Sequence, residues 1–157
     1  MAYTNFPERL RGLPQWIMWK YESRGDGTPT KVLYSPKGYK ASSTKAESWG
    51  TFEECTDRLK ASNLYNGVGF VFTKGIIGID LDKCLNEDGT TKQWAKDILN
   101  LFDSYTERSP SKKGLHIIIE SVIDFTGHKK EWLNELKEKE GIECYVRSRY
   151  FTVTGDV

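Results

Sequence analysis

Short runs of hydrophobic residues, several of them alternating with polar ones, predict β-strands along much of the chain. The runs are 15–21 (QWIMWKY), 30–34 (TKVLY), 67–73 (GVGFVFT), 76–82 (IIGIDLD), 115–120 (LHIIIE), 142–146 (IECYV) and 149–155 (RYFTVTG). The turn-rich segment 22–29 (ESRGDGTP) joins the first two runs, which predicts a hairpin. A turn at Lys74 and Gly75 separates the third run from the fourth. The last two runs predict two strands or one bent strand.

A helical period marks three other segments, 51–62, 90–102 and 128–140. The first begins with a capping box formed by Thr51 and Glu54. The second has the clearest apolar face, made of Trp94, Ala95, Ile98, Leu101 and Phe102. The third (HKKEWLNELKEKE) is charged on most sides and predicts a solvated helix that ends at Gly141.

This mixture of elements favours an α+β fold with a largely antiparallel sheet. The 157 residues contain no internal repeat, low-complexity tract or long linker, so we expect one domain, residues 1–157. Within it, residues 1–62 are expected to form a small N-terminal αβ lobe and residues 63–157 the second half.

Composition excludes several classes of protein. No apolar stretch approaches the roughly 20 residues needed to cross a bilayer, and the N-terminus lacks a signal-peptide pattern, so we expect a cytoplasmic protein without membrane association. The three cysteines, Cys55, Cys84 and Cys144, lack metal-binding or disulfide spacing and are expected to be reduced. The net charge of +1 gives no global positive field, so any nucleic-acid binding must come from local patches.

Two aspartates at the end of a predicted strand are the first candidate site. In IIGIDLD, Asp80 and Asp82 point to the face opposite the apolar residues, with their Cα atoms about 7 Å apart. Like charges this close repel each other unless a cation lies between them, and a divalent metal fits. Taken alone, the pair is as easily explained by two solvated acids at a turn.

A loop before the strand at 115–120 is the second candidate. Residues 109–114 (SPSKKG) combine hydroxyl groups, backbone N–H groups and lysines, which suit an anionic phosphate, and His116 follows on the strand. The third candidate is Glu143, which lies on the opposite face of its strand from its apolar neighbours and is followed by Arg147 and Arg149. Together the three segments indicate a site for a metal-bound triphosphate.

In order and spacing, GIDLDKCL (78–85), SYTERSPSKKGLHIII (104–119) and GIECYVRSRYFTVTG (141–155) resemble the three motifs of the archaeo-eukaryotic primase superfamily, particularly phage and plasmid primase-polymerase domains. The likeness covers almost the whole chain. It departs at Lys112 and Lys113, where relatives often carry a second glycine or a basic residue, and in relatives the sequence continues into helical segments and often a helicase. The matched positions are Asp80 and Asp82 in motif one, Ser111, Gly114 and His116 in motif two, and Glu143 in motif three.

The resemblance implies a primase-like fold with an RRM-like catalytic half and a metal-dependent nucleotidyltransferase, a DNA primase or DNA polymerase of phage or plasmid replication. Its implied partners are NTPs or dNTPs, a single-stranded DNA template, and a helicase or C-terminal domain outside this chain. Two Mg²⁺ or Mn²⁺ ions would be held by the catalytic acids Asp80, Asp82 and Glu143. The implied nucleotide-binding residues are Ser111, Lys113, Gly114, His116, Arg147 and Arg149.

Two other functions remain open on the residues alone. A catalytically silent RRM-like nucleic-acid-binding module would explain the sheet and the aromatic residues, but it has no use for three acids on one face. A sugar-nucleotide transferase also uses an Asp-x-Asp pair to hold a metal-bound diphosphate, but it favours alternating β and α units around a parallel sheet.

Overall fold

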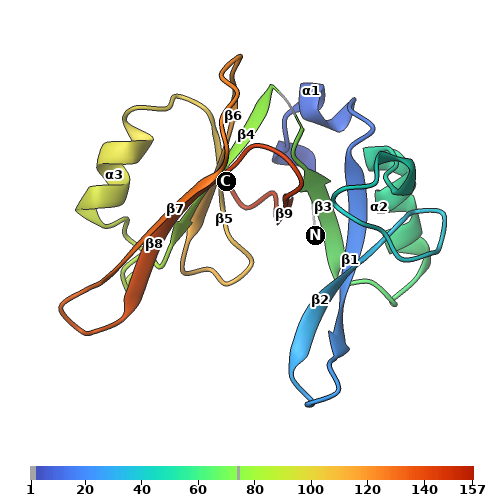
Figure 1. Ribbon diagram of the computed structural model, residues 1–157, viewed down its shortest axis with the longest axis horizontal. Helices are drawn as coiled ribbons and strands as arrows, with labels where there is room; N and C mark the ends of the chain where they lie inside the picture. The colour runs from blue at the N-terminus through green and yellow to red at the C-terminus, as the bar shows by residue number, and fades with distance from the viewer. Residues whose placement is uncertain (1–2, 74) are drawn as a thin grey trace. The chain divides into compact units, whose positions relative to one another are not determined.

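The computed structural model describes residues 3–73 and 75–157 and confirms an α+β protein in which every described strand pair is antiparallel (Figure 1). Its strands are β1 (Trp16–Ser23), β2 (Pro29–Tyr34), β3 (Gly67–Val71), β4 (Ile76–Asp82), β5 (Tyr105–Arg108), β6 (Leu115–Glu120), β7 (His128–Leu133), β8 (Lys139–Tyr145) and β9 (Tyr150–Thr152). Its helices are η1 (Tyr3–Asn5), α1 (Glu8–Arg11), η2 (Ala46–Ser48), α2 (Phe52–Ala61) and α3 (Gln93–Leu99). Among the described residues, no helix is long and apolar enough to cross a membrane.

The strands form two sheets, and the chain divides into two units around them. The four-stranded unit, Phe6–Val71 with Ser148–Val153, has the strand order β2-β1-β3-β9. The five-stranded unit contains Phe72–Arg147 and Thr154–Val157, together with Tyr3–Asn5, and has the order β5-β6-β4-β8-β7. Strand β3, expected in the half that begins at residue 63, pairs with β1 in the four-stranded unit.

Aromatic packing holds the four-stranded unit together. Trp16 is fully buried and meets the rings of Phe6, Phe52 and Phe70 edge-on, at centroid distances of 4.9, 4.8 and 5.2 Å. Phe52 starts α2, and the predicted capping box at Thr51 is confirmed. Helix α2 therefore begins where its first side chain packs against the sheet.

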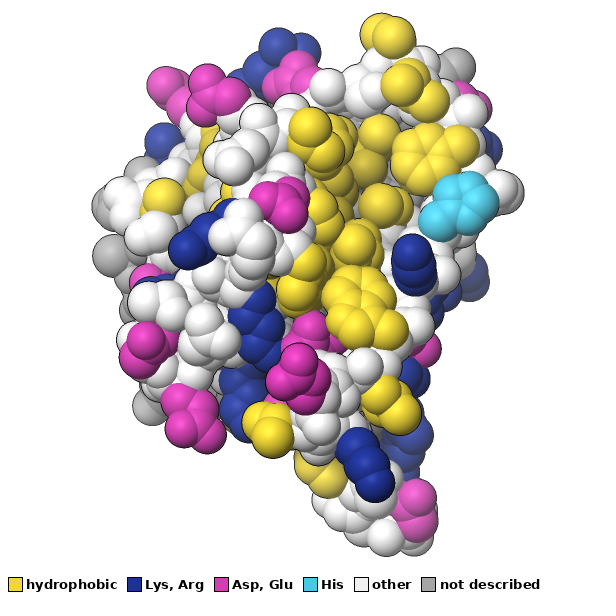
Figure 2. Space-filling view, turned by 90° about the vertical axis from the view of Figure 1, so that its left-hand side faces the viewer, with side chains coloured by type: hydrophobic (Ala, Val, Ile, Leu, Met, Phe, Trp, Pro, Cys, Tyr) yellow, Lys and Arg dark blue, Asp and Glu magenta, His cyan; other side chains and the backbone are white. Residues whose placement is uncertain are grey.

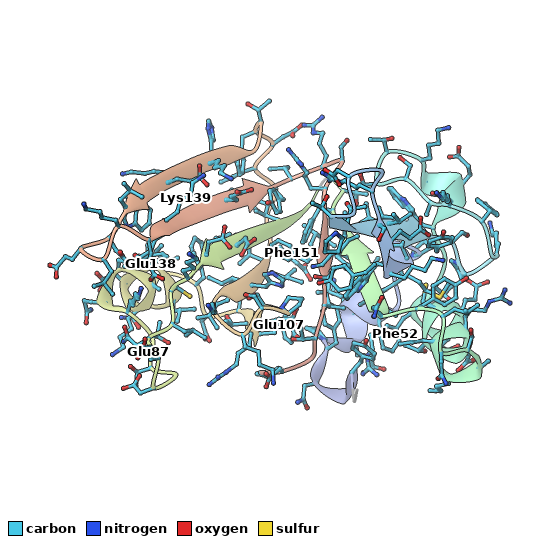
Figure 3. The ribbon with its side chains drawn as sticks, turned by 90° about the horizontal axis from the view of Figure 1, so that it is seen from below. Phe52, Glu87, Glu107, Glu138, Lys139 and Phe151 are labelled. Atoms are coloured by element: carbon cyan, nitrogen blue, oxygen red, sulfur yellow. The ribbon has the colours of Figure 1, made fainter. Side chains whose placement is uncertain are left out.

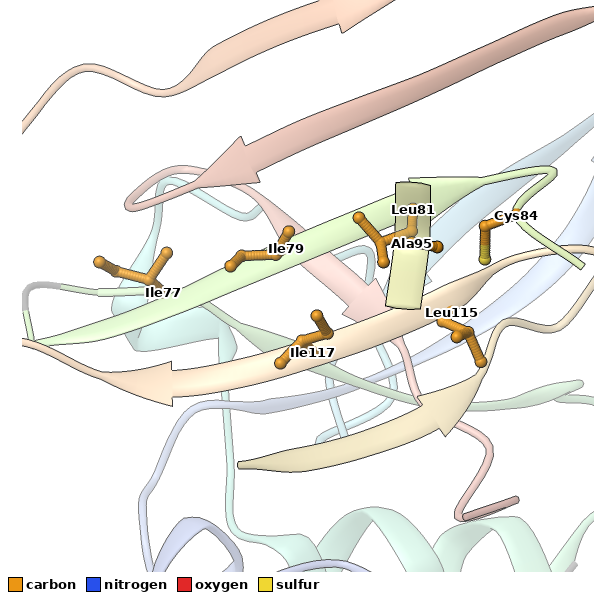
Figure 4. Close-up of a cluster of buried hydrophobic side chains, with 7 residues drawn as sticks. All are labelled: Ile77, Ile79, Leu81, Cys84, Ala95, Leu115 and Ile117. Atoms are coloured by element: carbon orange, nitrogen blue, oxygen red, sulfur yellow. The ribbon is translucent and has the colours of Figure 1, made fainter. Parts of the chain in front are cut away.

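The five-stranded unit has one apolar face and one polar face. Ile77, Ile79 and Leu81 of β4 all point to the apolar face (Figure 4). They form a buried cluster with residues of β6 and α3, namely Leu115, Ile117 and Ala95. Because side chains alternate along a strand, Asp80 and Asp82 point to the opposite face, as predicted.

Helix α3 is shorter than predicted and covers only part of the apolar face. It ends at Leu99, so Leu101 lies beyond it and is 75% exposed, contrary to the prediction that it belongs to the apolar helix face. Hydrophobic side chains gather in a strip on this side of the molecule (Figure 2). They line a hollow that includes Ile79, Phe102, Ile119 and Phe125.

The predicted helix at 128–140 is wrong, because this segment forms β7, a turn and the start of β8. Lysine and glutamate favour helices in isolation, but here they pair on a sheet surface, as Lys139 does with Glu131 at 2.7 Å. The turn is built by Asn134, whose side chain accepts from the backbone of Glu138, and by Lys137 at φ 59°. Gly141, expected to end a helix, lies inside β8.

The other predicted elements hold with few changes. The hairpin of β1 and β2 and strands β3, β4 and β6 are confirmed, whereas β5 was not predicted. The turn at Lys74 lies outside the described residues. The three cysteines are free; Cys55 and Cys84 are buried and Cys144 is half-buried.

Candidate active site

Five polar side chains, one from each strand, form a row across the polar face of the five-stranded sheet. The register places them directly opposite one another in the order Glu107, His116, Asp80, Glu143 and Lys129, from β5 to β7. Directly opposed residues of antiparallel strands point to the same face. At a strand spacing of about 4.8 Å, this polar row extends over about 19 Å.

Asp80 lies at the centre of the polar row and is mostly buried. Its Oδ1 atom is buried and has no hydrogen-bond partner among the described residues. The Nε2 atom of His116 is 3.9 Å from it, too far for a hydrogen bond. The pKa of Asp80 is raised to about 6, chiefly by burial; the charge of His116 opposes the increase, those of Asp82 and Glu143 add to it, and that of Lys129 opposes it. A buried carboxylate oxygen without a partner is a fitting ligand for a cation.

Glu143 lies opposite Asp80 and has two contacts of its own, one from β7 and one from β8. Its carboxylate forms an ion pair with Lys129 and accepts a hydrogen bond from the Tyr145 hydroxyl. Burial favours a higher pKa for Glu143, but the contacts with Lys129 and Tyr145 outweigh it and lower the pKa below its ordinary value. Lys129 also pairs with Glu131 at 3.0 Å, and both carboxylates raise its pKa.

Asp82 lies two residues farther along β4, opposite Gly141, and is exposed. The three predicted acids therefore share one face, as expected from their strand positions. Within the described residues, however, no three Asp, Glu, His or Cys side chains converge closely enough to hold a metal ion as they stand. The Glu143 carboxylate contacts the ammonium group of Lys129 rather than converging with the two aspartates. The metal site at Asp80, Asp82 and Glu143 stays a prediction.

His116 is buried and its ring is tied to Glu107. The Nδ1 atom lies 3.2 Å from Oε1 of Glu107, whose side chain is fully buried. The opposite ring nitrogen, Nε2, lies on the side of Asp80. The structure thus brings the histidine of the second predicted segment beside the aspartate of the first.

The predicted phosphate loop is the turn between β5 and β6. The amide of Lys112 donates to the Ser109 carbonyl and the amide of Ser109 to the Gly114 carbonyl, at 2.8 and 2.9 Å. The amides of Lys113 and Gly114 donate to the hydroxyls of Ser111 and Ser109. Because the loop satisfies these N–H groups internally, a phosphate would meet mainly its exposed side chains.

Gly114 has a packing reason as well. A Cβ atom at this position would lie 2.5 Å from the carbonyl oxygen of Leu81, at the end of β4. Only glycine permits this approach of the loop to β4. The exposed side chains of Ser111, Lys112 and Lys113 remain on the surface of the turn.

The two predicted arginines belong to different units. Arg147 is in the five-stranded unit, where it pairs with Asp124. Arg149 is in the four-stranded unit and is exposed. The structure does not bring Arg147 into the polar row. That Arg147 and Arg149 bind the nucleotide stays a prediction.

Three site residues were missed from the sequence. Glu107 lies on the unpredicted strand β5, and Lys129 lies in the segment predicted as a helix. Tyr145 was treated as part of a strand without chemistry. The available signal for β5 was the alternation of residues in YTER (105–108). Four residues are too few to give a strong period-two signal.

Comparison with known proteins gives one informative match. The chain is 38% identical over 148 residues to the DNA primase-polymerase of Nitratiruptor phage NrS-1, an alignment that covers 91% of this chain and 19% of the relative. The chain thus spans about a fifth of the length of that protein. No family model matches this chain. The chain is therefore related to a part of a phage DNA primase-polymerase.

Proposed function

We propose that this chain is a metal-dependent nucleotidyltransferase of the archaeo-eukaryotic primase type, which acts as a DNA primase, a DNA polymerase or both in phage or plasmid replication. The observation that carries the proposal is the partnerless oxygen of Asp80, buried between His116 and Glu143 on the polar face of the sheet. The relationship to a phage primase-polymerase supports it. Under this proposal the sheet corresponds to the RRM-like catalytic half.

The acids are proposed to hold the divalent ions. Asp80 contributes a buried oxygen and Asp82 an exposed one on the same face, while Glu143 approaches from the neighbouring strand. Mg²⁺ or Mn²⁺, when bound, would align the attacking 3′-oxygen with the α-phosphate and stabilise the charge that develops on the leaving group. Glu143 must exchange its contact with Lys129 to take part, so this lysine competes with the metal for the same carboxylate.

The triphosphate is proposed to lie over the turn between β5 and β6. Exposed side chains of Ser111 and Lys113 would contact its outer phosphates, with His116 behind them. Gly114 allows the turn to approach β4 closely enough to bring these groups near Asp80. Arg147 would have to leave Asp124 to join them, and Arg149 would have to come from the other unit.

The direct test is primer synthesis and extension. Protein, labelled dNTPs or NTPs, Mn²⁺ and a single-stranded DNA template are incubated, and products are resolved on a gel. We expect extended products from the wild type and none from Asp80→Asn. The inactive variant also controls for adventitious polymerase. Asp57→Asn, which makes the same change in a side chain that is 75% exposed, should retain full activity.

A catalytically silent nucleic-acid-binding module is the competing function, favoured by the ion pair of Lys129 with Glu143, which neutralises one acid without a metal. Nucleotide titration by calorimetry separates the two. Binding of a dNTP only in the presence of Mn²⁺ supports the nucleotidyltransferase. Binding of an oligonucleotide regardless of metal, with no nucleotide binding, supports the silent module.

A further inference from the structure

We infer that Glu107 is a positioning residue that fixes the orientation and tautomer of the His116 ring. The orientation of the ring is inferred from the geometry of the five-stranded unit alone. The consequence, triphosphate binding by His116, rests on the proposed function. Glu107, labelled in Figure 3, lies on β5 at one end of the polar row. Lys129 of β7 is at the other end.

The Glu107 carboxylate is surrounded by donors. Besides His116 Nδ1, it receives the Tyr105 hydroxyl at 2.7 Å, the Thr154 amide at 3.0 and 3.2 Å and the Gly155 amide at 2.8 Å. Backbone amides can only donate, so the carboxylate serves as an acceptor throughout. With no exposed surface on its side chain, Glu107 exchanges none of these contacts for water.

The proton arrangement of His116 follows from this environment. A carboxylate that accepts from all its other partners also requires a proton on Nδ1 of His116. In the neutral ring, Nε2 is then an acceptor; in the charged ring, it is a donor. Either way, Glu107 holds Nε2 toward Asp80, 3.9 Å away, and prevents the ring from turning over. The same arrangement would hold Nε2 ready for a phosphate oxygen.

Glu107 also fastens the segment Thr154–Gly155 to β5, so its replacement has a structural effect besides the one on His116. The test must separate these effects. Tyr105→Phe removes a different donor from the same carboxylate and leaves the Nδ1 contact in place, which makes it the matched control. Glu107→Gln keeps the size of the side chain but introduces an NH₂ group among donors, so at least one contact is lost.

The first measurement is ¹⁵N NMR of the histidine rings. The chain has only two histidines, so His128→Gln assigns both sets of signals. At a pH where the ring is neutral, we expect His116 in the Nδ1–H tautomer in the wild type and in Tyr105→Phe, and a shift toward the Nε2–H tautomer in Glu107→Gln. A wild-type His116 in the Nε2–H tautomer would overturn the inference, whether or not any variant folds.

The second measurement is a double-mutant cycle on dNTP affinity in Mn²⁺. We expect Glu107→Gln to weaken binding by about tenfold in the wild-type background and by much less when His116 is already alanine, as for residues in direct contact. Equal losses in both backgrounds would overturn the inference, because the effect would then be purely structural. If no protein binds dNTP, the proposed function fails, and the NMR result alone decides the role of Glu107.

Discussion

Replacing Asp80 with asparagine should stabilise the metal-free protein. The carboxylate is mostly buried, carries an oxygen without a partner, and lies near the acids Asp82 and Glu143, so its ionised form is unfavourable. Asparagine has nearly the same shape and no charge. The substitution therefore removes the electrostatic cost while it leaves the packing on β4 in place.

The size of the effect follows from the pKa of Asp80. Its carboxyl has an ordinary pKa of 3.8 in the unfolded chain and one of about 6 in the folded protein. At about 1.4 kcal/mol per pKa unit, ionisation costs the folded state about 3 kcal/mol. Because the folded protein retains a proton that the unfolded chain releases, this loss of stability builds up as the pH rises from about 4 to about 6. The advantage of Asp80→Asn should be small at pH 4 and complete above pH 6.

Urea denaturation in EDTA at several pH values between 4 and 8 measures this difference. Hydrogen exchange of the β4 and β6 amides would report on the five-stranded unit by itself. Asp57→Asn is the surface control and should change stability by less than about 0.5 kcal/mol at every pH. An Asp80→Asn protein no more stable than the wild type at pH 7.5, or with an advantage that does not narrow toward pH 4, would refute the electrostatic argument.

Three further predictions concern the binding of nucleotide, metal and DNA. Ser111→Ala and His116→Ala should each weaken dNTP binding, measured by calorimetry, by about 1 to 3 kcal/mol. Binding of the nucleoside monophosphate should weaken much less. Equal losses for the triphosphate and the monophosphate would point to base or sugar contacts. Lys129→Met should raise Mn²⁺ affinity, measured by electron paramagnetic resonance, because the ammonium group no longer competes for Glu143; unchanged affinity would exclude the competition. With a net charge of +1, the isolated chain should bind single-stranded DNA weakly at near-physiological salt, and a sub-micromolar dissociation constant by fluorescence anisotropy would contradict this.

Period-two patterns carried most of the information that the sequence held about the site. The strand IIGIDLD has a continuous apolar side, and this alone fixed the face on which Asp80 and Asp82 emerge. The same reasoning placed Glu143 opposite Ile142 and Cys144, and the structure pairs it with Asp80. Local alternation predicts the facing of a side chain well because it depends only on neighbours along the chain.

Pairing between strands could not be derived in this way. The segment HKKEWLNELKEKE contains good helix formers, and only its pairing with Ile142 and neighbouring residues makes β7 a strand. That error concealed Lys129. Glu107 was hidden for a different reason, since its strand has four residues and its role depends on pairing with His116 on the next strand and on Thr154, which lies 47 residues away in the sequence.

The polar row makes the proposed chemistry a property of strand alignment. Each of its five members comes from a different strand, and a slip of one residue in any pairing would turn that member to the apolar side of the sheet. Insertions or deletions within β4, β6 or β8 should therefore abolish function even where the sheet re-forms, whereas changes in the length of the segment between β6 and β7 leave the row aligned.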